Sequence, residues 1–444
     1  MAAPDLSGAI RPILLKLALP VIASNLLVAV ISFTDFKMVG WLGKEAIAAL
    51  SMSRTALFII QSAFMGAGIG ATAYVARSYG AGRTDEMKRY AAQAVMMCIY
   101  ISVPITLLGY SIGPGMHHWL GADPVTAGYG WDYLSMIYIG MSVIGLRFIV
   151  TGVMNALGRT DVPMYLNVAF AFLNLIFNFL LIPKWGMFGC ALGTTLTSLL
   201  VFGYGVLYMH FKGWAAFAIS QFSGAERAIR NMLALAGPAM LQVVARSGAG
   251  LLMYKVISLV PNSTVGAATL GLGLQGESIS FMPGLAVMTA SATLVGQALG
   301  AGRKDKAAET LRESRNLTLL IMILLGIVFF AFAREFMVFF TKDPDVIREG
   351  IRYLRINAFA QPIMAISFSG IGCLRGAGDT KYPFITTLLS HYLFRLPVAY
   401  LLGVSLGMGI LGIWISFLIS NVAEALLILH RLSQGKWLHI ELKY

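Results

Sequence analysis

Runs of 18 or more mostly apolar residues recur along the whole 444-residue chain. A run of this length crosses about 30 Å of hydrocarbon as an α-helix. The composition agrees, because hydrophobic residues make up 58% of the chain and charged residues only 12%, whereas soluble domains carry about 25% charged residues. The chain is therefore predicted to be an all-α integral membrane protein.

Twelve membrane-spanning helices are predicted, separated by short connectors such as GAGR, PKWG and TKDP. The expected helices span residues 12–41, 46–76, 88–113, 126–152, 162–183, 187–211, 229–259, 264–296, 308–332, 345–373, 382–403 and 408–431. The longest connector, 212–228, leaves six helices on each side. We therefore expect an N-lobe at 1–211, a cytoplasmic linker at 212–228 and a C-lobe at 229–444.

The two halves repeat one another at a nearly constant offset. The matching pairs are Gly80/Gly300 (each the first residue of GAGR), Asp123/Asp343, Tyr133/Tyr353 and Pro163/Pro383 at an offset of 220, and Pro20/Pro238 at 218. Equivalent positions are six helices apart, so both halves have the same orientation. The repeat is therefore parallel, with a pseudo-two-fold axis along the membrane normal, and it suits alternating access by rocking of two bundles.

The net charge of +13 does not indicate nucleic-acid binding, because the basic residues are spread between apolar segments and form no single patch. One set of alternate connectors holds 20 of the 33 Lys and Arg residues, and the other set holds 9. The positive-inside rule then places both termini and the 212–228 linker in the cytoplasm.

Asp35 follows the apolar run SNLLVAVISFT in the first predicted helix. A charge at the centre of a membrane helix costs at least about 2.5–3.5 kcal/mol on insertion scales. Asp35 is therefore a candidate proton carrier, protonated in one facing state and ionised in the other. The alternative is that Asp35 lies at the wet outer end of the helix, since Lys37, Trp41 and Lys44 follow closely.

The fifth predicted helix, YLNVAFAFLNLIFNFLLIP, carries three asparagines: Asn167, Asn174 and Asn178. Asn174 and Asn178 are four residues apart, so they share one helix face. Together with Asp35 they form either an oxygen-rich site for a proton or a hard cation, or ordinary interhelical hydrogen bonds worth about 1 kcal/mol each. The residues alone leave both interpretations open.

The predicted helices of the second half carry a different set of charges: Arg246, Lys255, Glu277, Arg395 and Glu424. Arg246 and Glu277 are expected to pair across adjacent helices, because an unpaired charge is costly there. A cationic centre at this place favours anionic or zwitterionic substrates over dications.

Two further features lie inside predicted helices. Pro20 precedes Asp35 by about four turns of the same helix, and a bend at Pro20 is a candidate gating element that shifts the carboxylate. Residues 271–276 match GxGxxG, but they lack the strand and βαβ context of a dinucleotide site. Close helix packing through small residues is the better interpretation.

Several motifs together resemble one transporter family over nearly the whole chain. The Pro-containing first helix leads to TDFKMVGWLG, and the second helix ends in VARSYGAGR. The second half contains FMPGLAVMTASATLVGQALGAGR, GIGCLRGAGDTKYP and FRLPVAYLLG, with Arg395 at the expected Arg. The chain therefore resembles the multidrug and toxic compound extrusion (MATE) family.

The resemblance implies an antiporter of the bacterial cytoplasmic membrane that exports organic compounds in exchange for H+ or Na+, without a cofactor. It places the N-lobe ion-coupling site at Asp35, Asn174, Asn178 and Thr194. Many prokaryotic members have Asp where this chain has Asn178, which weakens the case for Na+ at Asp35 and its two asparagines and makes H+ the first expectation. The matching C-lobe positions hold Arg246 and the neutral pair Asn357/Ala358, so the chain looks nearer the DinF-like branch.

Phe58, Gln61 and Met65 are placed in the substrate cavity from their positions in the second predicted helix, and a functional monomer is expected. The nearest alternative is a lipid-linked saccharide flippase of the same superfamily, which the basic residues Arg54, Arg147 and Arg246 keep open. A membrane enzyme is disfavoured because the six histidines show no metal-ligand spacing. A passive channel would give flux without ion exchange.

Overall fold

A computed structural model describes residues 8–120, 122–217 and 225–442 of the chain. Within these ranges the chain is almost entirely helical and has no β-strand. Ten described helices are long and apolar enough to cross a membrane, and a bent helix pair adds an eleventh crossing. One of the ten, α6 (Asp161–Phe211), is two helices joined at Gly186. The described residues therefore provide the twelve crossings that the sequence predicts.

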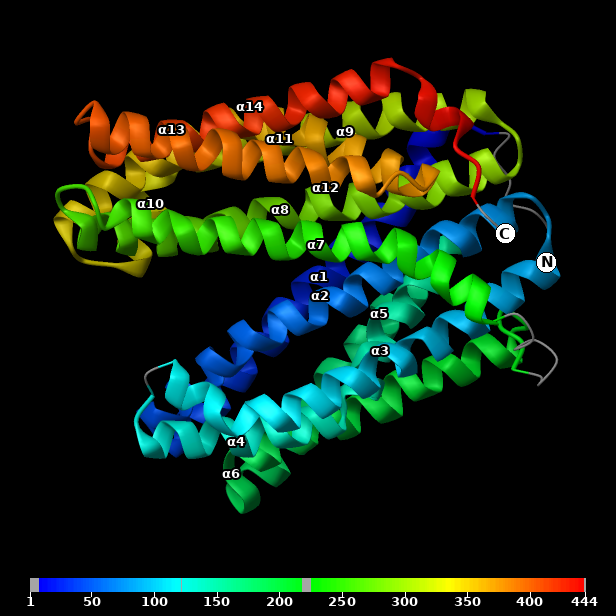
Figure 1. Cartoon of the computed structure of the whole chain (residues 1–444), viewed down its shortest axis with the longest axis horizontal. Helices are drawn as coiled ribbons and strands as arrows, with labels where there is room; N and C mark the ends of the chain where they lie inside the picture. The colour runs from blue at the N-terminus through cyan, green and yellow to red at the C-terminus, as the bar shows by residue number, and fades with distance from the viewer. Residues whose placement is uncertain (1–7, 121, 218–224, 443–444) are drawn as a thin grey trace. The chain divides into compact units, whose positions relative to one another are not determined.

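The chain divides into two compact units (Figure 1). Unit 1 comprises the described residues from Leu19 to Met240 together with Leu442, and unit 2 comprises those before Leu19 and from Leu241 to Glu441. The predicted division at 212–228 stays a prediction, since part of that segment, 218–224, lies outside the described residues.

Unit 1 is built around helix α2. Its elements are most of α1 (Ile10–Val39), the 3-10 turn η1 (Gly40–Leu42), α2 (Lys44–Gly80), α3 (Thr84–Trp119), α4 (Pro124–Ile139), α5 (Met141–Ala156), α6 and the start of α7 (Ala225–Ile257). Helix α2 packs against α3, α4 and α5, and α6 packs against α4 and α5. A large apolar core fills the space between these helices.

Unit 2 is built around helix α11. Its elements are the rest of α1 and α7, α8 (Ser263–Gly300), α9 (Lys304–Ala331), α10 (Ala333–Phe340), α11 (Pro344–Ala377), α12 (Lys381–Leu388), η3 (Leu389–Arg395), α13 (Leu396–Tyr400), η4 (Leu401–Ser405), α14 (Ile410–Ser433) and η5 (Lys436–His439). Helix α11 packs against α8, α9 and α14 (Figure 1).

Two predicted helices are interrupted, and one short helix is added, in ways that the apolar pattern does not reveal. The expected helix at 126–152 is the pair α4–α5, bent by 59° at Gly140. The expected helix at 382–403 contains the two π-helical segments η3 and η4. Pro397 lies just after η3 and has no N–H to donate to the preceding turn, which is consistent with the widened turn there. The short helix α10, which follows the expected helix at 308–332, was not predicted.

The internal repeat recurs as equivalent contacts within each unit. In unit 1 the backbone of Gly68 in α2 leaves no room for a Cβ at Gly152 in α5, and in unit 2 the backbone of Met288 in α8 leaves none at Gly372 in α11. Both partners in the second contact follow those in the first by 220 positions. The repeat therefore preserves the close approach of the second and fourth crossings of each half.

A second pair of equivalent contacts joins the first and fifth crossings. Asn167 donates to Ser24 at 2.5 Å in unit 1, and Gln242 donates to Thr387 at 2.9 Å in unit 2. These residues occupy repeat-related positions at the same offsets of 218 and 220. The GxGxxG segment also packs as predicted, because a Cβ at Gly273 would collide with the ring of Tyr353.

Candidate ion-coupling and substrate sites

Asp35 lies in α1, in unit 1, and only 5% of its surface is exposed. The alternative of a wet carboxylate at the helix end is therefore wrong for this structure. Its position follows from the sequence, because the apolar run before it continues the helix and the first glycine after it, Gly40, begins η1. A carboxylate held away from water in this way needs polar partners.

Arg54 of α2 is the charged partner of Asp35. The Arg54 Nη2 atom lies 2.6 Å from the Asp35 Oδ2 atom, and Nη1 of the same guanidinium donates to Ser32. The guanidinium also lies over the ring of Phe36, 4.7 Å from its centroid. The ion pair therefore connects consecutive helices and leaves the site with one negative and one positive charge.

The other partners of Asp35 come from α6. Asn178 Nδ2 donates to Asp35 Oδ1 at 2.7 Å and to Asn174 Oδ1 at 3.2 Å. Asn174 Nδ2 in turn lies 3.4 Å from Thr194 Oγ1, beyond the break at Gly186. The structure thus brings together the four residues that the family resemblance places at the ion-coupling site.

One buried atom of this cluster lacks a partner. The Oδ1 atom of Asn178 makes no hydrogen bond within the described part of the chain, and Gly193 approaches it so closely that a Cβ there would lie 2.6 Å away. An amide offers both a donor and an acceptor. Asn178 can therefore donate to an ionised Asp35 and, after rotation of its amide, accept from a protonated one.

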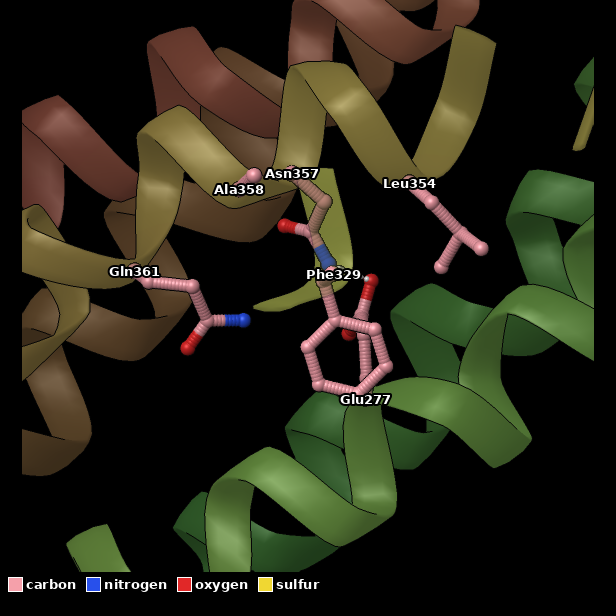
Figure 2. Close-up of a pocket in the computed structure, with 6 residues that line it drawn as sticks. All are labelled: Glu277, Phe329, Leu354, Asn357, Ala358 and Gln361. Atoms are coloured by element: carbon pink, nitrogen blue, oxygen red, sulfur yellow. Dashed lines mark hydrogen bonds between the residues drawn. The ribbon is translucent and has the colours of Figure 1, made fainter. Parts of the chain in front are cut away.

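Glu277 of α8 is the buried carboxylate of unit 2. Its Oε1 atom accepts hydrogen bonds from the Tyr353 hydroxyl and from Asn357 Nδ2, both of α11. Figure 2 shows the Asn357 and Gln361 side chains of α11 directed toward the small pocket that Glu277 lines. Gln361 donates to Ser280 Oγ, one turn after Glu277, at 3.1 Å.

The expected Arg246–Glu277 pair is wrong. Arg246 Nη2 lies 3.2 Å from Glu424 Oε1 of α14, and the same oxygen accepts from Thr387 at 3.0 Å. Glu277 and Glu424 both lie in membrane helices of the second half, so the sequence alone could not show which of them pairs with Arg246. Arg246 and Glu277 nevertheless line one cavity together with Arg395.

The remaining predicted site residues are placed as follows. Phe58 is 48% exposed, and Gln61 and Met65 are half-buried on the same helix, α2. The residues that line the two pockets described in unit 2 do not include these three. Pro20 lies inside α1, as predicted.

Arg54 is the site residue that sequence reasoning missed, although a signal for it was present. Asp35 is the only acidic residue within the first two predicted spans, 12–41 and 46–76, and Arg54 is the only basic residue in the second. Because an unpaired charge is costly in a membrane helix, their pairing could have been predicted. No group of three or more His, Cys, Asp or Glu side chains is placed to hold a metal ion in the described ranges.

Comparison with known proteins identifies the family. The MatE family profile matches residues 20–180 and 238–401. "Probable multidrug resistance protein NorM" of Thermotoga maritima is 28% identical over 442 residues, covering 96% of this chain and 93% of the relative. Multidrug resistance protein MdtK of Yersinia pestis is 25% identical over 448 residues, and the alignment covers 96% of this chain and 95% of the relative.

The fold agrees with solved transporter structures. A MOP superfamily transporter from Pyrococcus furiosus superposes with a TM-score of 0.90 over 99% of this chain and all of that chain, at 18% identity. The apolar helices make the present chain a multi-pass membrane protein. The family profile covers well over half of its length, so the chain belongs to the MatE family, the multidrug and toxic compound extrusion transporters.

Proposed function

We propose that this chain is an antiporter, not an enzyme, that exports organic compounds in exchange for protons by alternating access. Family membership and the relatives named as multidrug resistance proteins support export of small organic molecules. The observation that carries the coupling step is a buried carboxylate, Asp35, that contacts Arg54 and Asn178 at 2.6 and 2.7 Å.

Protonation of Asp35 changes the interactions between helices. In its ionised form, Asp35 holds the Arg54 guanidinium of α2 and the Asn178 amide of α6. A proton on the carboxylate removes the charge that attracts Arg54, so the link between α1 and α2 weakens. The Asn178 amide can remain bonded in either state by rotating. Proton binding thereby alters helix packing without leaving Asp35 unsatisfied.

The charge balance of this cluster favours H+ over Na+. Asp35 is the one formal negative charge among Asp35, Asn174, Asn178 and Thr194, and a tethered cation, Arg54, already occupies one side of it. A bound Na+ would lie close to the guanidinium, and like charges at such separations repel strongly in a poorly solvated site. A proton neutralises the carboxylate directly and meets no such obstacle.

The remaining proposals concern the whole molecule. The uneven distribution of Lys and Arg between the connectors supports a bacterial cytoplasmic-membrane protein with both termini inside. The internal repeat supports two parallel lobes that divide around 212–228. We place Phe58, Gln61 and Met65 in the substrate path. We also propose that the functional unit is a monomer and that the chain lies nearer the DinF-like branch of the family. The flippase alternative loses support, because carboxylates pair with Arg54 and Arg246.

Transport by purified protein in liposomes tests the proposal. Vesicles with an acidic lumen are expected to accumulate external rhodamine 6G, an organic cation, as protons leave, and Na+ inside is expected to add nothing. Asp35→Asn should abolish the effect of the pH gradient. Accumulation driven by a Na+ gradient alone would assign coupling to Na+, and accumulation that ignores both gradients would favour a passive pathway.

Asn167→Leu is the matched control for the coupling step. Asn167 lies in the same helix and is buried like Asn174 and Asn178, but its amide donates to Ser24 and not to Asp35. This variant should keep its response to the pH gradient. Loss of that response in both Asp35→Asn and Asn167→Leu would point to general disruption of unit 1.

A further inference from the structure

Unit 2 contains a cavity of about 330 Å³, within the size range of small-molecule sites. Its polar lining includes Arg246, Glu277 and Arg395, and its apolar lining includes Leu274, Phe281 and Phe417. Charged groups beside aromatic and aliphatic walls form an amphipathic site. The sign of charge that such a site prefers depends on which of these groups already has a partner.

Arg395 has no carboxylate partner. Its Nε donates to Ser420 Oγ at 2.8 Å, its Nη2 donates to Asn421 Oδ1 at 3.2 Å, and its guanidinium lies 4.5 Å from the centroid of the Phe417 ring. The ion pairs found within the described residues do not include Arg395. The groups that accept hydrogen bonds from Arg395 are therefore neutral.

The two nearby acids are engaged by other groups. Glu277 Oε1 accepts from Tyr353 and Asn357, on the side of α8 that carries the pocket in Figure 2. Glu424 Oε1 accepts from Arg246 at 3.2 Å and from Thr387 at 3.0 Å. Glu277 is only 7% exposed, whereas Arg395 is half-buried and the Arg246 side chain is 38% exposed. The charge that the cavity lining leaves accessible to a ligand is therefore positive.

The backbone around Arg395 is also unusual. Arg395 ends the π-helical segment η3, and His391, four residues earlier in the same segment, lines the same cavity. Single π-helical turns within α-helices occur frequently at functional sites. The cavity and the irregular turn are independent features of unit 2 that meet at Arg395.

We infer that this cavity binds amphipathic organic anions, with Arg395 pairing with their carboxylate or sulfonate group. The aromatic and aliphatic lining, including Phe281 and Phe417, holds the apolar body of the ligand. The inference rests on the proposed transport function for its physiological meaning, because it adds amphipathic anions, bound in unit 2, to the organic compounds that the exporter carries. Binding itself requires neither an ion gradient nor Asp35.

A purely structural role for Arg395 makes a different prediction. If the guanidinium only joins η3 to Ser420 and Asn421 of α14, the cavity should bind a carboxylate and an amide of the same shape with equal affinity. A matched set of fluorescent probes separates the two cases: dansylglycine is an anion, dansylglycinamide is its neutral counterpart, and dansylcadaverine is a cation.

Binding is measured on the purified full chain in a neutral detergent, from the change in dansyl fluorescence. A charge-assisted hydrogen bond should make dansylglycine bind at least about tenfold more tightly than dansylglycinamide, with dansylcadaverine weakest. Equal affinities for dansylglycine and dansylglycinamide in the wild-type protein would overturn the inference, whatever the transport assays show. Failure of proton coupling with this preference intact would overturn only the proposed function.

Two variants assign the preference to Arg395. Arg395→Gln removes the charge, and Asn421→Asp supplies a nearly isosteric carboxylate 3.2 Å from Nη2. Each should reduce the preference for dansylglycine to about twofold or less. Arg355→Gln is the control, because Arg355 also lies over a phenyl ring, that of Phe330 at 5.2 Å, but does not line the cavity.

The second variant keeps the test decisive if Arg395→Gln does not fold. Asn421→Asp changes one amide nitrogen to oxygen and retains the acceptor that Arg395 uses, so it should elute from a sizing column like the wild type. A tenfold preference for dansylglycine that survives in folded Asn421→Asp would contradict the assignment, as would its loss in Arg355→Gln.

Discussion

Arg54 Nη2 lies 2.6 Å from Asp35 Oδ2, so the buried acid of the first membrane helix is paired with the basic residue of the second. An isolated carboxylate at this place would attract any small cation. A carboxylate that already holds a guanidinium is selective, because a proton can neutralise it whereas a metal ion must share the space with a positive charge. The pair therefore supports the proposed coupling of transport to protons at a site with a single acid.

Replacement of Arg54 is expected to relax this selectivity. Arg54→Gln removes the tethered cation and leaves Asp35 beside the oxygens of Asn174, Asn178 and Thr194, a set that suits a hard cation. We expect Na+ to stimulate transport by Arg54→Gln. Transport by Arg54→Lys, which keeps the positive charge, should not respond to Na+, as in the wild type. The measurement is the rate of rhodamine 6G accumulation in proteoliposomes with and without a Na+ gradient. Indifference to Na+ in Arg54→Gln would show that Arg54 does not exclude it.

Loss of the Asn178 amide should impair coupling more than loss of a neighbouring amide. Asn178→Leu has a similar volume but leaves Asp35 without its 2.7 Å donor, at a cost of about 1–3 kcal/mol. We expect the rate driven by the pH gradient to fall about tenfold or more, while Asn167→Leu keeps most of it. Equal losses in both variants would mean that Asn178 serves only to pack α6.

The close approach of α8 and α11 can be tested through stability. A Cβ at Gly372 would lie 2.5 Å from the Met288 carbonyl oxygen, a backbone atom that cannot move aside cheaply. Gly372→Ala should therefore cost about 1–3 kcal/mol and lower the temperature at which the detergent-solubilised protein aggregates.

Gly128→Ala provides the control for that experiment. Gly128 lies within α4 and has no neighbour within 4 Å of an added Cβ, so alanine should be neutral or stabilising by up to about 1 kcal/mol. Equal effects of the two substitutions would contradict the close packing described here for α8 and α11.

Much of the fold could be predicted from the sequence, because long apolar runs and a repeat are direct physical signals. The break at Gly186 lies in the PKWG connector between two predicted helices, and it is where they meet. The bend at Gly140 and the π turns of η3 were not predictable, because glycine and proline are common inside membrane helices and do not always interrupt them.

The site was predicted in part. Asn174 and Asn178 stand out as polar residues in an apolar helix, and the structure places them beside Asp35. The partner of Arg246 was predicted wrongly, since two glutamates of the same half could reach it and only packing selects Glu424. Charge partners between helices depend on helix rotation, which periodicity alone does not specify.

The most direct test of the central claim is proton release from purified protein on substrate binding. In a weakly buffered, mildly acidic detergent solution, saturating rhodamine 6G should displace the proton from Asp35 and acidify the medium by about one proton per chain. Asp35→Asn should bind the compound and release none. Proton release of the same size from both proteins, or none from the wild type despite binding, would contradict the assignment of Asp35 as the coupling residue.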